Sequence, residues 1–458
     1  MSRTRIVRGK ISEVVGGDLR YYSEANIIEN ATDIYSEKSA QTILHNGNPE
    51  KPSAGEIKAK CLVQFRPHDK YKDDPCFGFD WLRAGDSGQK GDHWFGSIMG
   101  RYFEEATFIK PFANTNGWTQ DKKNNPNGYF KKELSMYDKK LKSYKSFSLS
   151  WKKVSKKPFL YPIPTLTLLK GNSALFNLKI EIQEKPKKLT FEFQNKEAEK
   201  YLTLNIKEIG DIKKGAYDKF NYFKITCKKS FDKEHLLYVK ADGEICGAMR
   251  IHPNSKTFIR TIKVLFVKVK TDVNGVEVTG EPATDGYDFF VKNMNQALVK
   301  PHFEEIILNC KSNLLYDTFK NKFCTNDAGV YKVTKDKGLK EYFERELKSK
   351  FGSKYSGYFT LFFVGEKGAW NGFAFPATTF GVYFNGHNKA TIAHEAMHAM
   401  RLPHTFASVN QKNLIRDYTY EATRTNNLMD YSHVAKPPIE RFCTYKWQWK
   451  VLNNKIIK

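Results

Sequence analysis

The sequence predicts a multidomain chain that is β-rich in its first half and mixes α-helices and β-strands in its C-terminal part. Short runs that alternate apolar and polar residues, typical of strands, follow one another up to about residue 255. From about Lys256, strand patterns and helix patterns alternate instead. The length of 458 residues suits about two to four domains, each able to bury its own core.

Residues 1–158 are predicted to form a β-rich module with a lysine-rich end. Residues 1–54 alternate β-prone runs with Gly, Asn and Asp, which suits a small sheet or a short solenoid-like spike. Between Lys122 and Lys157, 12 lysines face only Glu133 and Asp138. Lysine dominates there, with little arginine or aromatic chemistry. We therefore expect a solvated basic face and no specific nucleic-acid recognition.

Charge and composition constrain the cellular context. The formal net charge of +25 favours adhesion to anionic surfaces. The seven cysteines are scattered and form no CxxC pattern, so no disulfide framework is predicted. The N-terminus lacks the apolar stretch of a signal peptide, and no long apolar run suggests a transmembrane segment. We expect synthesis in the cytoplasm without a signal peptide and export by a signal-independent route.

Residues 159–255 are predicted to form an immunoglobulin-like β-sandwich. Residues 160–164, Leu-Tyr-Pro-Ile-Pro, are interpreted as the linker that leads into it. The short alternating strands that follow are typical of such a sandwich. They cover residues 165–169, 174–182, 189–193, 202–206, 222–226, 236–239 and 248–251.

Residues 256–458 are predicted to form an α+β domain that folds without the upstream segments. The hydrophobic periodicity switches between the period of a strand and that of a helix. Strands are expected at residues 262–269, 305–308 and 358–364, and helices at 287–298, 339–350 and 439–452.

A metal-binding pattern lies near the C-terminal end of this part. His394 and His398 are four residues apart, so both imidazoles leave one face of a helix and can bind one metal ion. Glu395 lies beside them, and the neighbouring residues are mostly apolar helix formers, as expected of a buried helix. The spacing therefore predicts two ligands and an adjacent acid on one helix.

A third ligand is predicted from the way this helix ends. Pro403 biases Leu402 out of helical geometry, so the helix should stop near Arg401 and the chain can return His404 to the metal. Three neutral nitrogen ligands leave a fourth position for water. That arrangement is typical of a catalytic zinc site.

The whole stretch from His394 to His404, HEAMHAMRLPH, resembles the metzincin pattern HExxHxxGxxH. Residues 402–406, LPHTF, are similar to the GLxHTF ending of pappalysin-type and matrixin-type members. Arg401 stands where the family has its turn glycine; in a left-handed backbone, arginine costs about 1 kcal/mol more than glycine. Residues 427–431, NLMDY, resemble the family's Met-turn.

The resemblance implies further roles. Met429 would be the apolar floor beneath the metal. Tyr431 would stabilise the oxyanion, although a structural tyrosine bonded elsewhere fits the position as well. Residues 381–384 match the strand that leads into the active helix. Residues 372–376, including Gly372, Phe373, Ala374 and Phe375, match the family's edge strand, where an extended peptide can bind by β-augmentation.

The sequence thus predicts a zinc-dependent (Zn2+) endopeptidase on residues 256–458, in which Glu395 takes a proton from water and passes it to the leaving amine. Residues 25–34 resemble the repeats of needle and tip proteins of contractile secretion systems, and the N-terminal block of about 150 residues, including the aromatic- and glycine-rich stretch 77–96, is similar to leader regions of bacterial type VI secretion cargo. This resemblance implies an exported effector or toxin. Its partners would be a protein or peptide substrate, the secretion apparatus and a cognate inhibitor. The alternative is a secretion-tip or adhesive binding protein with a catalytically inactive zinc-protease fold.

Overall fold

The computed structural model describes residues 59–103, 119–120, 129–311, 318–375, 378–406 and 414–456. They form a β-rich fold with several sheets, as predicted. Ala59–Lys458 make up one compact unit. The strands expected within residues 1–54 lie outside the described part of the chain.

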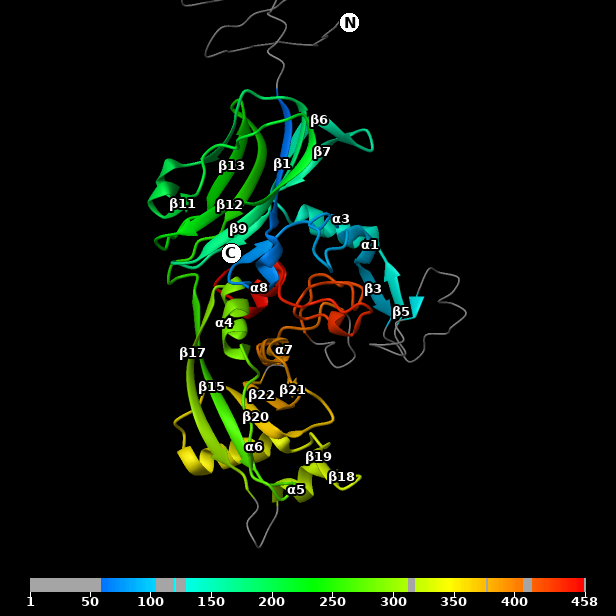
Figure 1. Ribbon diagram of the computed structural model, residues 1–458, viewed down its shortest axis with the longest axis vertical. Coiled ribbons are helices and arrows are strands. Elements are labelled where there is room, and N and C mark those ends of the chain that lie inside the picture. The colour runs from blue at the N-terminus through cyan, green and yellow to red at the C-terminus, as the bar shows by residue number, and fades with distance from the viewer. Residues whose placement is uncertain are drawn as a thin grey trace, which may run out of the picture. The chain divides into compact units, whose positions relative to one another are not determined.

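Two sheets share one core in the first half of this unit (Figure 1). The first has the order β1-β9-β12-β11 and is antiparallel throughout; the second has the order β10-β13-β14-β8-β2. Phe65 of the first sheet meets Phe191 of the second at a ring distance of 6.3 Å. The strands are β1 (Lys60–Pro67), β2 (Gly78–Asp80), β8 (Thr165–Thr167), β9 (Ser173–Glu184), β10 (Leu189–Phe193), β11 (Leu202–Leu204), β12 (Gly215–Cys227), β13 (His235–Ala241) and β14 (Glu244–Ile251).

The strands predicted between residues 165 and 251 are confirmed as β8 to β14. The predicted linker is wrong, because its first three residues lie in β7 (Lys157–Pro162), which pairs with β6 (Ser146–Val154). Tyr161 is 1% exposed, and its hydroxyl donates to the Ala248 carbonyl at 3.1 Å. Proline is tolerated at the end of such a two-stranded ribbon, so the prolines did not exclude a strand.

A third sheet organises the C-terminal half. Its order is β16-β15-β20-β22-β21, and β17 also pairs with β15. β17, β15, β20 and β22 run parallel to one another, whereas β16 is antiparallel to β15 and β21 is antiparallel to β22. The strands are β15 (Arg260–Thr271), β16 (Val278–Thr279), β17 (Val299–Asn309), β20 (Phe359–Lys367), β21 (Gly372–Ala374) and β22 (Phe380–Asn385).

Helices cover both faces of this sheet. Successive residues of a strand point to opposite sides, so its strands present apolar side chains on both faces. In β15, Val264 and Phe266 join the core that contains α4 (Gly286–Gln296) and α7 (Lys389–Ala399). Leu265 and Val267 join a second core with α5 (Thr318–Phe323) and α6 (Leu339–Phe351). The buried runs of β15 and β20 follow from this two-sided cover.

The predicted closing helix is shorter than expected. α8 covers only Lys446–Leu452, whereas residues 439–445 are not helical. Its start is set by Gln448, whose side chain accepts from the Tyr445 N–H at 2.7 Å as part of a capping box. The remaining elements are α1 (Phe95–Ile98), β3 (Gly100–Phe103), β4 (Thr119–Gln120), β5 (Tyr129–Lys132), α3 (Leu134–Lys142), β18 (Cys324–Asp327) and β19 (Val330–Val333).

One hydrophobic core runs from the upstream segments into the C-terminal half. The ring of Phe95 lies 5.1 Å from that of Tyr420 and 5.6 Å from that of Tyr445. Tyr71 meets Phe442 edge to face at 5.7 Å. These contacts cross the predicted boundaries at residues 158 and 255. Those boundaries stay predictions.

Candidate metal centre

Helix α7 carries two of the three predicted ligands. The side chain of Asn388 accepts a hydrogen bond from the Thr391 N–H at 2.9 Å and caps the first turn. The helix lies against α4, β21 and β22, and its apolar side is buried. His394 and His398 therefore project one turn apart from a helix that packing holds in place.

The helix ends in a Schellman motif that returns the chain toward the histidines. The Arg401 N–H donates to the His398 carbonyl at 2.9 Å, and the Leu402 N–H donates to the Met397 carbonyl at 3.0 Å. Leu402 is buried, which completes the motif. Arg401 has the left-handed φ of 73° that its resemblance to a turn glycine implied. The predicted end of the helix near Arg401 is confirmed.

Arg401→Gly should raise the free energy of unfolding by about 1 kcal/mol, because glycine adopts this backbone without Cβ strain. Arg401→Ala is the matched control, since it removes the side chain but keeps the strain. Chemical denaturation of the three proteins measures the difference. An Arg401→Gly protein no more stable than Arg401→Ala would contradict the expectation.

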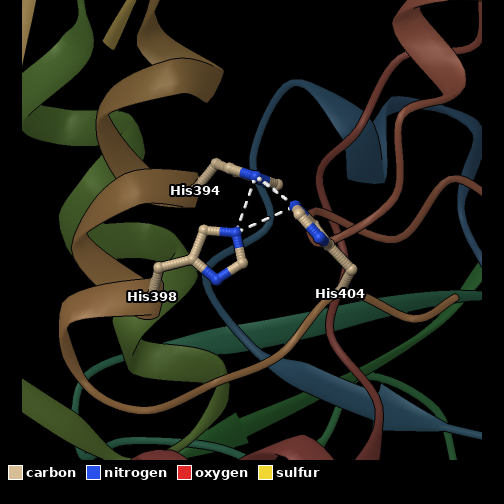
Figure 2. A group of neighbouring side chains, drawn as sticks. All are labelled: His394, His398 and His404. Atoms are coloured by element: carbon tan, nitrogen blue, oxygen red, sulfur yellow. Dashed lines mark hydrogen bonds between the residues drawn. The ribbon is translucent and has the colours of Figure 1, made fainter. Parts of the chain in front are cut away.

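The three histidines converge on one point, as Figure 2 shows. The Nε2 atom of His398 lies 3.0 Å from the Nε2 atoms of His394 and His404, which are themselves 3.2 Å apart. All three side chains are buried. This group could hold a metal ion.

The protons of two rings are placed by backbone carbonyls. Nδ1 of His394 lies 2.8 Å from the Leu428 carbonyl, and Nδ1 of His398 lies 2.7 Å from the Leu402 carbonyl. A carbonyl only accepts, so each Nδ1 carries the proton and each Nε2 keeps its lone pair. Burial lowers the pKa of all three imidazoles, that of His398 to about 4. Neutral rings with inward lone pairs are the state that binds a metal.

Glu395 lies at the edge of this group. One carboxylate oxygen is 3.9 Å from Nε2 of His394. Burial raises the pKa of Glu395 to about 8; the positive charge of Arg441 and a hydrogen bond from the Ala374 backbone act in the opposite direction. The Glu395 side chain is 14% exposed, so it is less deeply buried than that of His394.

The segment 427–431 supports two of the three histidines through its backbone. The Leu428 carbonyl bonds the His394 ring, and the Met429 carbonyl accepts the Thr405 N–H at 3.1 Å, next to His404. The Met429 side chain is fully buried. Tyr431 packs its ring 4.6 Å from that of His404 and 5.9 Å from that of His394. The structure thus brings both predicted residues to the histidine group.

The sequence patterns did not point to the polar residues that hold this segment. The Asp430 carboxylate accepts from the N–H groups of Thr423, Thr425 and Tyr431 at 2.7–2.8 Å. Arg441, 7% exposed, donates to the Asp430 carbonyl at 3.0 Å. Asp430 has a local signal, since aspartate often bonds nearby backbone in turns. No local sequence pattern marks Arg441, because only the fold brings this residue close to Glu395 and His394.

The predicted edge strand is present as β21, which ends at Ala374, so Phe375 lies just outside it. Phe373 packs toward the second core, and its ring lies 5.5 Å from that of Phe375. Gly372 faces the other side, where an added Cβ would come within 3.0 Å of Tyr383 and 3.2 Å of Thr391 of α7. Ala374 meets Glu395 through its backbone. The strand thus lies directly beside the helix of the histidines.

Comparison with known proteins does not assign the chain to a family. No family model matches the chain, and no curated protein matches it. Among the described residues, every helix is too short or too polar to span a bilayer.

Proposed function

We propose that the protein is a zinc-dependent endopeptidase of the metzincin type. The observation that carries this proposal is the convergence of three buried imidazole nitrogens within 3.2 Å of one another, with the Glu395 carboxylate 3.9 Å from one of them. A three-histidine group beside a carboxylate is the arrangement that hydrolytic zinc sites use.

The geometry of the three nitrogens suits zinc. Nitrogens that bind a tetrahedral zinc ion at about 2.0–2.1 Å lie about 3.3 Å apart, close to the separations in this group. Without a cation, three lone pairs would face one another in a buried space. Imidazole donors favour zinc over magnesium or calcium, which prefer oxygen ligands. Three protein ligands would leave a position for catalysis.

The residues of the chain supply the other parts of a peptidase. A bound zinc ion would act as a Lewis acid that acidifies water and polarises a peptide carbonyl. The positive charge of a bound zinc ion would favour the ionised form of Glu395, which would then accept the proton of the attacking water and pass it to the leaving amine. Burial raises the pKa of Tyr431 to about 12, so its hydroxyl keeps its proton near neutral pH and would donate to a developing oxyanion. Strand β21 would hold an extended peptide.

The surrounding assignments are part of the same proposal. The two sheets around Phe65 would be the immunoglobulin-like sandwich, and the chain would be an exported bacterial effector or toxin. Its partners would be a protein or peptide substrate, the secretion apparatus and a cognate inhibitor.

Each chain should bind one zinc ion, and His404→Ala should weaken zinc binding at least about tenfold, because it removes one of three converging ligands. Chelator competition and elemental analysis measure this. His433→Ala is the matched control: His433 is exposed and lies outside the convergent group. Full zinc affinity in His404→Ala would remove His404 from the ligand set.

The peptidase activity itself is tested by labelling new N-termini in a lysate treated with the full-length protein. New termini should appear with the zinc-loaded protein, disappear after chelation and return with added zinc. Identical termini with and without chelator would argue against metal-dependent proteolysis.

A further inference from the structure

The β6–β7 hairpin ends in a basic tip, which we define as residues 152–157, Lys-Lys-Val-Ser-Lys-Lys. The two strands pair as far as Val154 and Lys157. Ser155 and Lys156 form the turn with φ values of 49° and 67°, as a type I′ hairpin requires. In Figure 1 this end of the hairpin extends beyond the neighbouring strands.

The base of the hairpin is anchored, so the tip is presented in a defined position. Leu149 and Tyr161 are buried in a small cluster with Leu62 of β1 and Ala248 of β14. The Phe147 ring stacks on that of Tyr161 at 4.8 Å. Lys152, the first residue of the tip, forms an ion pair with Glu181 of β9. These contacts connect the hairpin to both sheets of the first half.

Beyond this anchor the tip is cationic and uncompensated. Lys153, Lys156 and Lys157 are exposed and form no ion pair with any described residue. Val154 lies among them and is 54% exposed, which is unusual for an aliphatic side chain at the end of a hairpin. The tip therefore combines three available ammonium groups with one exposed apolar group.

We propose that this basic tip docks the protein on an anionic phospholipid membrane. Ammonium groups bind lipid phosphates and carboxylates as point charges, and Val154 can enter the boundary between head groups and acyl chains. The tip contains no arginine fork and no aromatic ring, which are the groups that read or stack on bases, so a membrane fits it better than nucleic acid. The inference does not depend on the proposed peptidase activity.

The test is sedimentation of the full-length protein with vesicles of phosphatidylcholine containing about 30% phosphatidylserine. Binding should be absent with phosphatidylcholine alone and should weaken as salt increases. The variant Lys153→Gln/Lys156→Gln/Lys157→Gln should bind roughly a hundredfold more weakly, since each lysine near such a surface contributes about a factor of five. Val154→Ser keeps the charge and should weaken binding severalfold.

The matched control is Lys187→Gln/Lys188→Gln/Lys228→Gln, which removes the same charge from exposed positions outside the hairpin. It should retain most of the affinity, and unchanged thermal unfolding of all variants shows that they fold. Equal losses in the tip variant and the control would overturn the proposal in favour of net charge alone. A tip-dependent affinity for duplex DNA without vesicle binding would overturn it in favour of nucleic acid.

Discussion

Glu395→Gln should leave the zinc content unchanged and reduce peptide turnover by a factor of roughly 100 to 10,000. Glutamine keeps the size of the side chain and can still accept the hydrogen bond from Ala374, but it cannot take a proton from water. Because Glu395 lies beside His394 without belonging to the convergent group, its substitution separates catalysis from metal binding. Cleavage of a broad peptide library, with elemental analysis on the same samples, measures both.

The control for this experiment is Glu341→Gln, an exposed change of the same chemistry on helix α6, which lies against the second core. It should retain full turnover. A Glu395→Gln protein as active as the wild type would exclude Glu395 as the general base. If wild type and variant both fail on every peptide, the secretion-tip or adhesive binding protein becomes the better hypothesis.

The fragment 256–458 should fail to fold, although the sequence patterns alone suggested an independent domain. Removing the upstream part strips the ring contacts of Phe95 and Tyr71 from Tyr420, Tyr445 and Phe442. A fully buried aromatic side chain contributes about 1.5–3 kcal/mol. The free energy lost by exposing three of them approaches the whole free energy of unfolding of a typical domain, about 5–15 kcal/mol.

Backbone pairing leads to the same expectation. The Gly100 N–H donates to the Thr419 carbonyl at 3.1 Å, and the Glu421 N–H donates to the Ile98 carbonyl at 2.7 Å. Tyr420, between these positions, donates through its N–H to the Thr405 carbonyl, next to His404. The upstream segment therefore supports the loop that carries the third histidine.

Circular dichroism and thermal unfolding of the fragments 256–458 and 59–458 provide the measurement. The longer fragment keeps the whole compact unit and should unfold cooperatively with zinc bound. Cooperative unfolding of the shorter fragment, with its zinc retained, would show that the upstream contacts are dispensable.

Sequence patterns predicted a strand or helix well where neighbouring residues alone determine it. The alternation in β10 and the apolar run of β20 placed those strands within a few residues, and the four-residue spacing of His394 and His398 placed them on one helix face. Pro403 marked the end of that helix. Each of these signals depends on neighbours in the sequence.

Partners distant in the sequence could not be predicted in this way. β1 pairs with β9 across more than a hundred residues, and no feature of either strand specifies the other. Arg441 reaches the histidine group only because the chain folds back after segment 427–431. The start of α8 was missed because Gln448 and Tyr445 cap each other, whereas the aromatic residues before them only suggested continued burial. Tertiary contacts decided all three.

Other long-range contacts involve the last residues of the described chain and are therefore made late in synthesis. The Arg260 side chain donates to the Leu452 carbonyl at 2.6 Å, and a His252 ring nitrogen lies 2.7 Å from the Ile456 carbonyl. A ribosome adds about 5–20 residues per second, so His394 emerges seconds before these last partners. A nascent chain therefore carries the histidines before it has the residues that complete their core.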